Sequence, residues 1–565
     1  MKKVFIIMCM AVLTLSVSAQ FSTTPAFPGA EGYGRYTQGA RGGDEPVVLH
    51  VTSLEDGTDE DKGTFRWALA QKYPRIIVFD VSGTIFLTKK LTISGLQGCV
   101  TVLGQTAPGD GICIAYYPIH IEAENVIMRY LRFRLGDSSL TEDDAINACP
   151  VSSKSNIILD HCTMSWSVDE CASFYNLKMM SLQWCMISES LRISVHDKGT
   201  HGYGGIWGGN TVSFHHNLIA DHDSRNIRFD HDYVSTLKGP IDYINNVIYN
   251  WGGNSTYGGE SANPSGNNKK INMIANYYKP GEGSSHKSRF LQLTHSCPTC
   301  LEKYPGPVRT GVFYLDGNVM DNNATVTNDN WKGVEDYGDL ATLEGAKASA
   351  YQATSLTDYD LSDGGKNLMA VHTAANAFSK VVDYAGCSYR RDAVDNRIAT
   401  ETKNGTYGTY GKYSGTQTGA KGSKYGLIDT QEDVGGWPEL NEGDKPDDTD
   451  GDGMPDEWED ANGLDSQDPS DAVTTSLCDK DNGNTHNFKY TNIEVYANAL
   501  VEDMIKAQRS DAQSSFEEYY PACVKPTAVE AIHSNEILPA PKAVKVSRNG
   551  RITIGDYDVL GQKVK

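Results

Sequence analysis

Short β-rich segments recur along much of the chain, and this repeat constrains the fold more than any other feature of the sequence. Their spacing is mostly near 30 residues, and they begin at or near Val100, Val126, Ile157, Ser181, Val212, Ile241, Ile271 and Val312. One such segment cannot bury its apolar side alone, but stacked segments can. No 3.6-residue period runs through them, which excludes helices. We therefore predict an all-β fold, a right-handed parallel β-helix from about Val48 to Val319.

Several of these segments share one phase and reach an asparagine at the same point. Asn217, Asn246 and Asn276 each follow a strand-like run of apolar residues. In a parallel stack, equivalent positions lie about 4.8 Å apart. The shared phase predicts that the three side chains form a ladder of stacked amides.

The chain has 565 residues, which is too long for one compact core. The repeat fades after about Asp321, and Leu368 to Val382 resembles a helix. We expect five regions: a signal peptide (1–19), the β-helix (20–320), a partly helical and loop-rich extension covering it (321–444), a small acidic module (445–505) and a tail (506–565). The end of the tail is similar to short secretion sorting domains.

The N-terminus has the features of a signal peptide. Lys2 and Lys3 precede an apolar run from Val4 to Leu15, and small residues end at Ala19. The run is too short to span a bilayer, and no later apolar run is long enough either. We expect cleavage after Ala19 and delivery outside the cell or to its surface, with a retained anchor as the alternative.

The formal net charge of −22 limits the choice of partners. Nucleic acid is excluded as a partner, because phosphate binding requires a basic surface. An anionic glycan would also be repelled, unless a metal ion or a local group of arginines reverses the field.

The acidic module contains a complete match to the EF-hand calcium-loop formula. Its oxygen-bearing side chains are Asp448, Asp450, Asp452, Asp456 and Glu459, and Gly453 allows the sharp turn. Pro455 is unusual in such a loop, so the flanking helices of an EF-hand can be absent. We predict an EF-hand-like Ca²⁺ site with a structural role; the alternative is an acidic linker without metal.

Several motifs, taken in their order and spacing, resemble those of the pectate lyases, and the chain is similar to members of polysaccharide lyase family 1. They are Phe27 to Gly34, Val126 to Arg134, Asp143-Asp144, Asp160-His161 at the end of a strand, His201 to Gly209, and Ser224 to Arg228. The resemblance runs from about Phe27 to Leu500. It implies a calcium-dependent enzyme that cleaves homogalacturonan, a pectic polysaccharide, by β-elimination, and we expect a monomer.

The resemblance also implies roles for individual residues. Asp144 and Asp169 match calcium ligands, with Asp143, Glu142 and Glu170 nearby. Arg225 matches the arginine that abstracts the proton, and Arg228 would hold a substrate carboxylate. Lys198 or His201 could serve where the family has a substrate-binding lysine. Two positions depart from the family: Ser173 replaces an acid, and Ile227 replaces a proline.

The chemistry is coherent, with one difficulty. The C5 proton of galacturonate lies α to a carboxylate, and its removal leaves an anion that needs cationic stabilisation. An arginine base conflicts with the very high pKa of guanidinium, so that role depends on the resemblance. Asp160 and His161 are better explained as a pair that fixes a turn than as catalytic groups.

Two other functions remain open. Asp143-Asp144 could be the paired carboxylates of a polygalacturonase-type hydrolase on the same fold. The Ser173 departure is also compatible with a non-catalytic, pectin-binding β-helix.

Overall fold

The computed structural model describes residues 24–140, 143–230, 238–261, 269–294, 309–337, 369–408, 425–480 and 488–513, with short strands between 545 and 558. The predicted signal peptide and Glu142 lie outside the described residues. Within the described ranges, no helix has the length and apolarity needed to cross a membrane.

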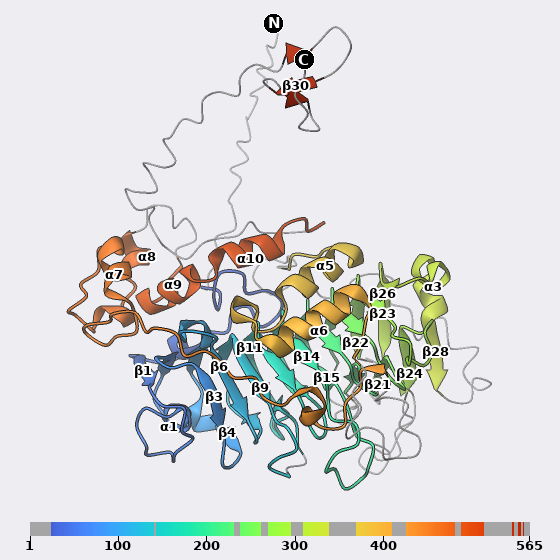
Figure 1. Cartoon of the computed structure of the whole chain (residues 1–565), viewed down its shortest axis with the longest axis horizontal. Helices are drawn as coiled ribbons and strands as arrows, with labels where there is room; N and C mark the ends of the chain where they lie inside the picture. The colour runs from blue at the N-terminus through green and yellow to red at the C-terminus, as the bar shows by residue number, and fades with distance from the viewer. Residues whose placement is uncertain are drawn as a thin grey trace, which may run out of the picture.

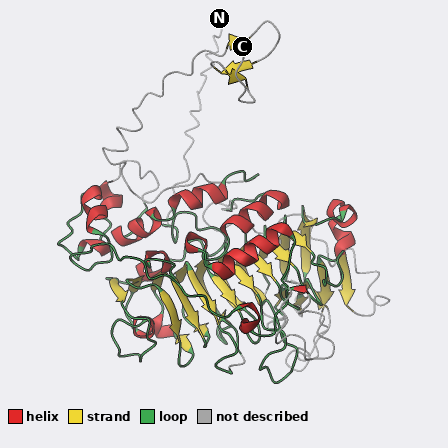
Figure 2. Cartoon of the chain, viewed as in Figure 1, coloured by secondary structure: helices red, strands yellow, loops and turns green. Residues whose placement is uncertain are grey.

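The chain winds through three stacks of parallel strands, which together form a parallel β-helix (Figures 1 and 2). Stack 1 contains β1 (Val47–Val51), β2 (Arg75–Phe79), β5 (Val100–Leu103), β8 (Val126–Arg129), β11 (Lys154–Asp160), β18 (Ile241–Ile244), β22 (Lys270–Ile274) and β26 (Val312–Asp316). Stack 2 contains β3 (Gly83–Phe86), β6 (Ile112–Ala115), β9 (Leu131–Arg134), β12 (Thr163–Ser165), β14 (Met186–Ser188), β16 (Leu218–Ala220), β19 (Val247–Tyr249), β23 (Tyr277–Lys279) and β27 (Val319–Met320).

Stack 3 contains β4 (Leu91–Ile93), β7 (Ile119–Ile121), β10 (Ile146–Ala148), β17 (Arg228–Phe229), β20 (Thr256–Gly258), β24 (Leu291–Thr294) and β28 (Val334–Tyr337). Two long strands, β13 (Ala172–Gln183) and β15 (Ile206–His215), belong first to stack 3 and then to stack 1. A short antiparallel pair, β21 (Glu260–Ser261) and β25 (Arg309–Thr310), lies outside the stacks. The parallel β-helix is confirmed, and stack 3 continues one strand beyond the predicted end.

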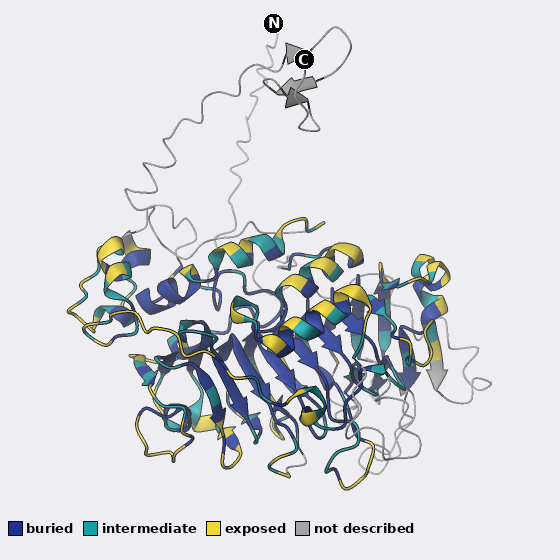
Figure 3. Ribbon diagram, in the orientation of Figure 1, coloured by how far each residue is buried: buried dark blue, intermediate teal, exposed yellow. Residues whose placement is uncertain are grey.

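Equivalent apolar residues align from coil to coil and fill the interior. In stack 1, Val126, Ile157, Met180, Val212 and Ile241 lie in one register, and all five are fully buried. The strands in the middle of the solenoid are accordingly dark blue, while teal and yellow segments appear towards its two ends (Figure 3). Each coil buries its apolar face only against its neighbours, so the stability of the fold is built up coil by coil.

A sharp corner with a positive-φ residue follows the stack 1 strands from β8 to β18. Tyr130, His161, Trp184, His216 and Asn245 occupy equivalent corners with φ between 52° and 55°. Left-handed backbone is costly for residues other than glycine. Here the rings stack on one another, with centroids 4.8 Å apart for Tyr130 and His161 and 4.3 Å apart for Trp184 and His216. This stacking helps to offset the backbone cost.

The predicted amide ladder is confirmed, and it lies one residue after these corners. The Nδ2 atoms of Asn217 and Asn246 each donate to the Oδ1 atom of the next asparagine, at 3.0 and 3.1 Å. Asn276 continues the series to Asn318 at 2.8 Å, and Asn318 continues it to Asn330 at 2.9 Å. All five asparagines are buried. The sequence predicted the first three members and missed the last two.

Helices of the second half of the chain lie along one side of the β-helix (Figure 1). They are α5 (Ala374–Tyr384), α6 (Ala393–Asn404), α9 (Asn492–Ala499) and α10 (Glu502–Arg509); other short helices are α1 (Phe65–Ala70), α3 (Ala324–Asn328), α7 (Asp456–Asn462) and α8 (Ser476–Lys480). The helix predicted from Leu368 to Val382 is thus present a few residues later. Buried Arg134 of β9 pairs with Asp392 and Asp395, which fixes α6 over stack 2.

Asp160 and His161 are buried beneath α10. Arg129 Nε donates to Asp160 Oδ2 at 2.8 Å, and His161 Nδ1 lies 2.7 Å from Asp160 Oδ1. The other ring nitrogen of His161 contacts Gln508 of α10 at 2.9 Å. The two residues therefore fix a corner and anchor a helix, which confirms the predicted structural role.

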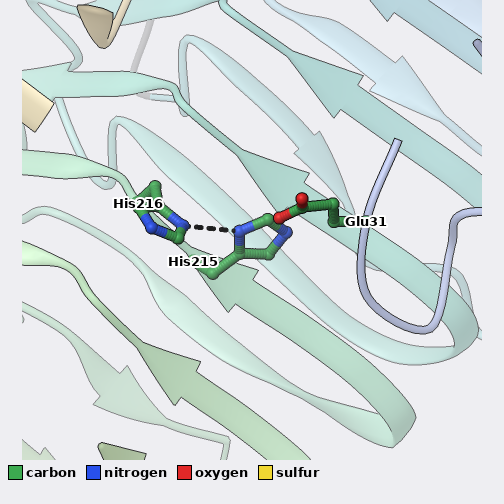
Figure 4. Close-up of side chains that lie close together, drawn as sticks. All are labelled: Glu31, His215 and His216. Atoms are coloured by element: carbon green, nitrogen blue, oxygen red, sulfur yellow. Dashed lines mark hydrogen bonds between the residues drawn. The ribbon is translucent and has the colours of Figure 1, made fainter. Parts of the chain in front are cut away.

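A chain of three buried histidines joins segments that are far apart in the sequence. His372 Nε2 lies 3.0 Å from the carbonyl oxygen of Ser510, His216 Nε2 lies 2.9 Å from His372 Nδ1, and the Nδ1 atoms of His215 and His216 are 2.9 Å apart. Figure 4 shows Glu31, from the N-terminal loop, beside the ring of His215, on the side away from His216. Burial lowers the pKa of His215 to about 3 and lowers those of His216 and His372.

Neutral rings can serve all three contacts in only one donor order. The Ser510 carbonyl can only accept, so His372 donates to it and accepts from His216, which in turn accepts from His215. The histidine chain thus ties the end of α10 and the segment near residue 372 to stack 1.

Candidate active site

The site residues enter from the loops that lead into stack 3 in successive coils. Asp144 precedes β10, Glu170 precedes β13, Tyr203 precedes β15, and Arg225 precedes β17. Isolated parallel bridges join Glu170 to Tyr203, and Tyr203 to Ser224. Adjacent strands lie about 4.8 Å apart, so coil stacking brings together residues that are 22 to 33 positions apart in sequence.

Three carboxylates form an acid triad at this edge. Ligand oxygens of Asp144, Asp169 and Glu170 all lie within 4.8 Å of one another. Asp144 is held in place by the backbone N–H of Glu170, at 3.1 Å, and by Asn147 Nδ2, also at 3.1 Å. Burial, and then the charges of Asp169 and Asp143, raise the pKa of Asp144 well above its ordinary value.

The acid triad is suited to a hard cation. Buried carboxylates that repel one another are stabilised by a metal ion, and Ca²⁺ prefers such oxygen ligands in a flexible arrangement. The residues present therefore fit the calcium that the sequence predicted. Glu170, predicted as a further metal residue that could substitute for the acid replaced by Ser173, lies together with Asp144 and Asp169.

Of the two arginines predicted for the site, Arg225 contacts the triad and Arg228 pairs with Glu260. The guanidinium of Arg225 contacts Glu170 directly and lies over the ring of Tyr203, 4.2 Å from its centroid. Arg225 has φ of +50°, a left-handed backbone that is costly for this residue type. Arg228 donates from Nη2 to Glu260 Oε1 at 2.8 Å. Arg225 and the acid triad thus share one edge of the fold, as expected from the sequence.

Other predicted residues lie at the margin of the triad. Asp143 is next to it in sequence, but its Oδ1 atom lies 3.2 Å from His120 Nε2. Lys198 is exposed, and His201 Nε2 lies 3.0 Å from Asp169 Oδ1. The Ser173 hydroxyl accepts from the backbone N–H of Ile206 at 3.2 Å, so it joins two coils.

The sequence interpretation missed His196 and the role of Tyr203. His196 Nε2 lies 3.9 Å from Asp169 Oδ2, and its ring is 3.8 Å from that of His201 between centroids. Burial, and the charges of His196 and Lys198, lower the pKa of His201. The signal that could have found His196 was a second histidine five residues before His201 in one polar loop.

The acidic module holds a second group of carboxylates. Ligand oxygens of Asp448, Asp450 and Asp452 lie within 4.8 Å of one another, and so do those of Asp452, Glu459 and Asp471. Both oxygens of the buried Glu459 carboxylate have no hydrogen-bond partner among the described residues. Burial, and then the neighbouring carboxylates, raise the pKa of Glu459 to about 8 and that of Asp452 to about 7.

Two features of this loop differ from the formula. The carboxylate of Asp456 accepts from the backbone N–H and the hydroxyl of Thr449, at 2.7 and 2.6 Å, and so closes the loop. Asp471, twelve residues beyond Glu459, belongs to the group although the 12-residue formula could not include it. Helix α7 begins inside the loop, at Asp456, and extends beyond it, while residues 441–450 are not helical. Of the two flanking helices of an EF-hand, the one before the loop is therefore absent among the described residues and the one after it is present.

The fold and the site together define the class of protein: a parallel β-helix that holds three carboxylates and an arginine, Arg225, at one edge. A probable pectate lyase C from Aspergillus flavus is 31% identical to this chain over 503 residues, covering 88% of this chain and 97% of that protein. A second one from Aspergillus oryzae is 32% identical over 503 residues with the same coverage. The chain belongs to the pectate lyase family, a family of polysaccharide lyases.

Two further comparisons are more distant. The major allergen of cedar pollen, a solved structure, aligns with a TM-score of 0.44 and 15% identity, covering 63% of this chain and 92% of that one. A pectate lyase bound to a hexasaccharide aligns with a TM-score of 0.40 and 14% identity, covering 66% and 99%. No family model matches the chain.

Proposed function

We propose that the protein is a calcium-dependent pectate lyase that cleaves α-1,4-linked galacturonan by β-elimination and releases 4,5-unsaturated products. The observation that carries this proposal is the meeting of Asp144, Asp169 and Glu170 with Arg225 at one edge of stack 3. Carboxylates gathered at one point suit a cation, whereas hydrolysis needs two carboxyl groups on opposite sides of the scissile bond. The acid triad therefore favours the lyase over a polygalacturonase-type hydrolase.

The chain's own residues have separable tasks in this reaction. Arg225 removes the C5 proton, the C4–O bond to the leaving sugar breaks, and the electron pair of the C5–H bond becomes the C4=C5 double bond. The leaving oxygen takes up a proton. Bound calcium supplies positive charge next to the sugar carboxylate, where negative charge develops. Arg228 would hold a second sugar carboxylate, and Lys198 or His201 a neighbouring group.

The contact between Glu170 and Arg225 links the arginine directly to the acid triad. A cation held by Asp144, Asp169 and Glu170 would compete with Arg225 for the Glu170 carboxylate. The guanidinium would then be freer to turn towards the sugar ring.

Further parts of the proposal concern the rest of the chain. The loop from Asp448 to Glu459, with Asp471, binds a second Ca²⁺ that holds the acidic module together. This module packs on the β-helix through Met454 and Ile493, against Ile76 and Val78 of β2. We also propose export, with the signal peptide removed after Ala19, and a monomeric enzyme.

The test is an incubation with polygalacturonate in calcium and then with excess chelator. A rise in ultraviolet absorbance marks the unsaturated product, and chelator should abolish it. Asp144→Asn should lower the rate steeply, and Asp321→Asn, an acid outside the site, should not. New reducing ends without the absorbance rise would establish hydrolysis instead. If neither signal appears, the protein is a pectin-binding protein without catalytic activity.

A further inference from the structure

The long loop between β14 and β15 brings two histidines to one carboxylate of the acid triad. His201 Nε2 lies 3.0 Å from Asp169 Oδ1, and His196 Nε2 lies 3.9 Å from Asp169 Oδ2. One ligand atom of each of the three residues lies within 4.8 Å of the other two. The three side chains thus bring their ligand atoms close to one another, between Asp169 and the two histidine rings.

We infer that Asp169, His196 and His201 form a second metal site, for a divalent transition metal of the zinc class, which shares Asp169 with the calcium site. Ligands of a tetrahedral zinc ion at 2.0–2.2 Å are separated from one another by about 3.3 Å. The distances from His201 Nε2 to Asp169 Oδ1, 3.0 Å, and from His196 Nε2 to Asp169 Oδ2, 3.9 Å, lie on either side of this value. Imidazole nitrogen favours zinc, cobalt and nickel, whereas calcium takes oxygen ligands.

The surroundings of the histidines support a metal site with one open side. The side chains of His196 and His201 are 5% and 11% exposed, while that of Asp169 is 28% exposed. The rings are therefore fixed in the protein, and the site opens at Asp169. The ring of His201 also packs on Tyr203, with centroids 4.4 Å apart. Three protein ligands and one open position are the pattern of zinc sites that admit water or substrate.

His196 also has the outer partner that metal-binding histidines usually have. Its Nδ1 atom lies 3.1 Å from Asp197 Oδ1, which can accept an Nδ1–H and leave the Nε2 lone pair for the metal. The backbone N–H of Lys198 also lies 3.1 Å from Nδ1 and competes for it. Metal binding at Nε2 requires the Asp197 contact to prevail.

The consequence is a site with two cations of different chemistry. Asp169 would bridge an all-oxygen site, completed by Asp144 and Glu170, and a nitrogen-containing site, completed by the two histidines. The inference does not rest on the proposed lyase activity, because it depends only on these ligand atoms and can be tested by metal binding.

The test uses cobalt, which absorbs visible light strongly when it is four- or five-coordinate with nitrogen ligands. Co²⁺ is titrated into the untagged full-length protein with calcium in excess, so that the all-oxygen sites are occupied. We expect a visible band that saturates at one equivalent and disappears when Zn²⁺ is added. His196→Gln and His201→Gln should each abolish the band, and Asp197→Asn should weaken cobalt binding about 10- to 100-fold.

Two variants serve as controls. His120→Gln removes a histidine that pairs with Asp143 at the other margin of the triad, and it should leave the cobalt band intact. The pair Asp450→Ala and Glu459→Ala empties the loop of the acidic module and should do the same. Circular dichroism of each variant confirms that it is folded.

Several results would overturn the inference. They are the absence of a visible band in the wild type, displacement of cobalt by calcium alone, and a band that survives in both folded histidine variants. Normal lyase activity with no cobalt band would remove this second site and leave the proposed function standing.

Discussion

Replacement of Asn246 by alanine should cost a large part of the stability of the β-helix. Its Oδ1 atom accepts from the backbone N–H and the Nδ2 atom of Asn217, both at 3.0 Å. Its Nδ2 atom donates to the Phe214 carbonyl at 2.9 Å and to Asn276 Oδ1 at 3.1 Å. The variant loses these bonds at a fully buried position. The stranded backbone N–H of Asn217 costs about 1–3 kcal/mol, and each of the three further lost bonds about 1 kcal/mol, so we expect a loss of about 4–6 kcal/mol.

Urea unfolding followed by tryptophan fluorescence measures this loss, because Trp184 and Trp207 are buried in the coils. With a slope of about 3 kcal/mol per molar urea, the midpoint should fall by at least about 1 M. Asn246→Asp keeps one acceptor but removes the donor, and should be at least as destabilising. Asn376→Ala, an exposed position in α5, should change stability by less than about 0.5 kcal/mol. An Asn246→Ala midpoint equal to that control would refute the reasoning.

Three further predictions concern catalysis, calcium and pH. Arg225→Lys should lower kcat on polygalacturonate at least about a hundredfold and change KM much less, because a positioned proton-transfer group is lost; near-normal turnover would make this assignment wrong. Asp450→Ala with Glu459→Ala should abolish the increase in Tm that calcium gives while the lyase rate stays near wild type, and a collapse of activity in the folded variant would contradict this. Burial depresses the pKa of His215 to about 3 and also lowers that of His216, so their contribution to stability is complete above about pH 6.5 and is lost as the pH falls. As the pH falls below 6.5, each of the two histidines should lower the free energy of unfolding by at most about 1.4 kcal/mol per pH unit, which calorimetry can measure. The dependence of this free energy on pH should be weaker in His215→Gln.

The repeat made the fold predictable, because the period of the strands, their apolar faces and the asparagine phase all follow from coil stacking. The first three ladder members were predicted for this reason. Asn318 and Asn330 were not predicted as ladder members because they lie 42 and 12 residues after the preceding member, and neither spacing fits the period of about 30 residues. The order of donors and acceptors, rather than the spacing, places them in the ladder.

The acid triad and Arg225 could be named in advance because the motifs that contain them resemble those of the pectate lyases. The convergence of His196 on Asp169 could not, because it depends on the path of one irregular loop. Asp471 was missed for a similar reason, since α7 separates it from the loop formula. Contacts between loops carry no periodic signal in a sequence.

The separation between strands and loops has a consequence for the origin of new specificity. The strands set the register of each coil, whereas the side chains of the site come from the segments between stack 2 and stack 3. The segment 189–205 alone carries His196, His201 and Tyr203. Leu191, near its start, belongs to the stacked core, so changes of length or composition should be confined to the part from residue 196 onwards. Related enzymes could therefore exchange substrates through grafting of this one segment, and a library confined to it would explore new ligand sets on an unchanged scaffold.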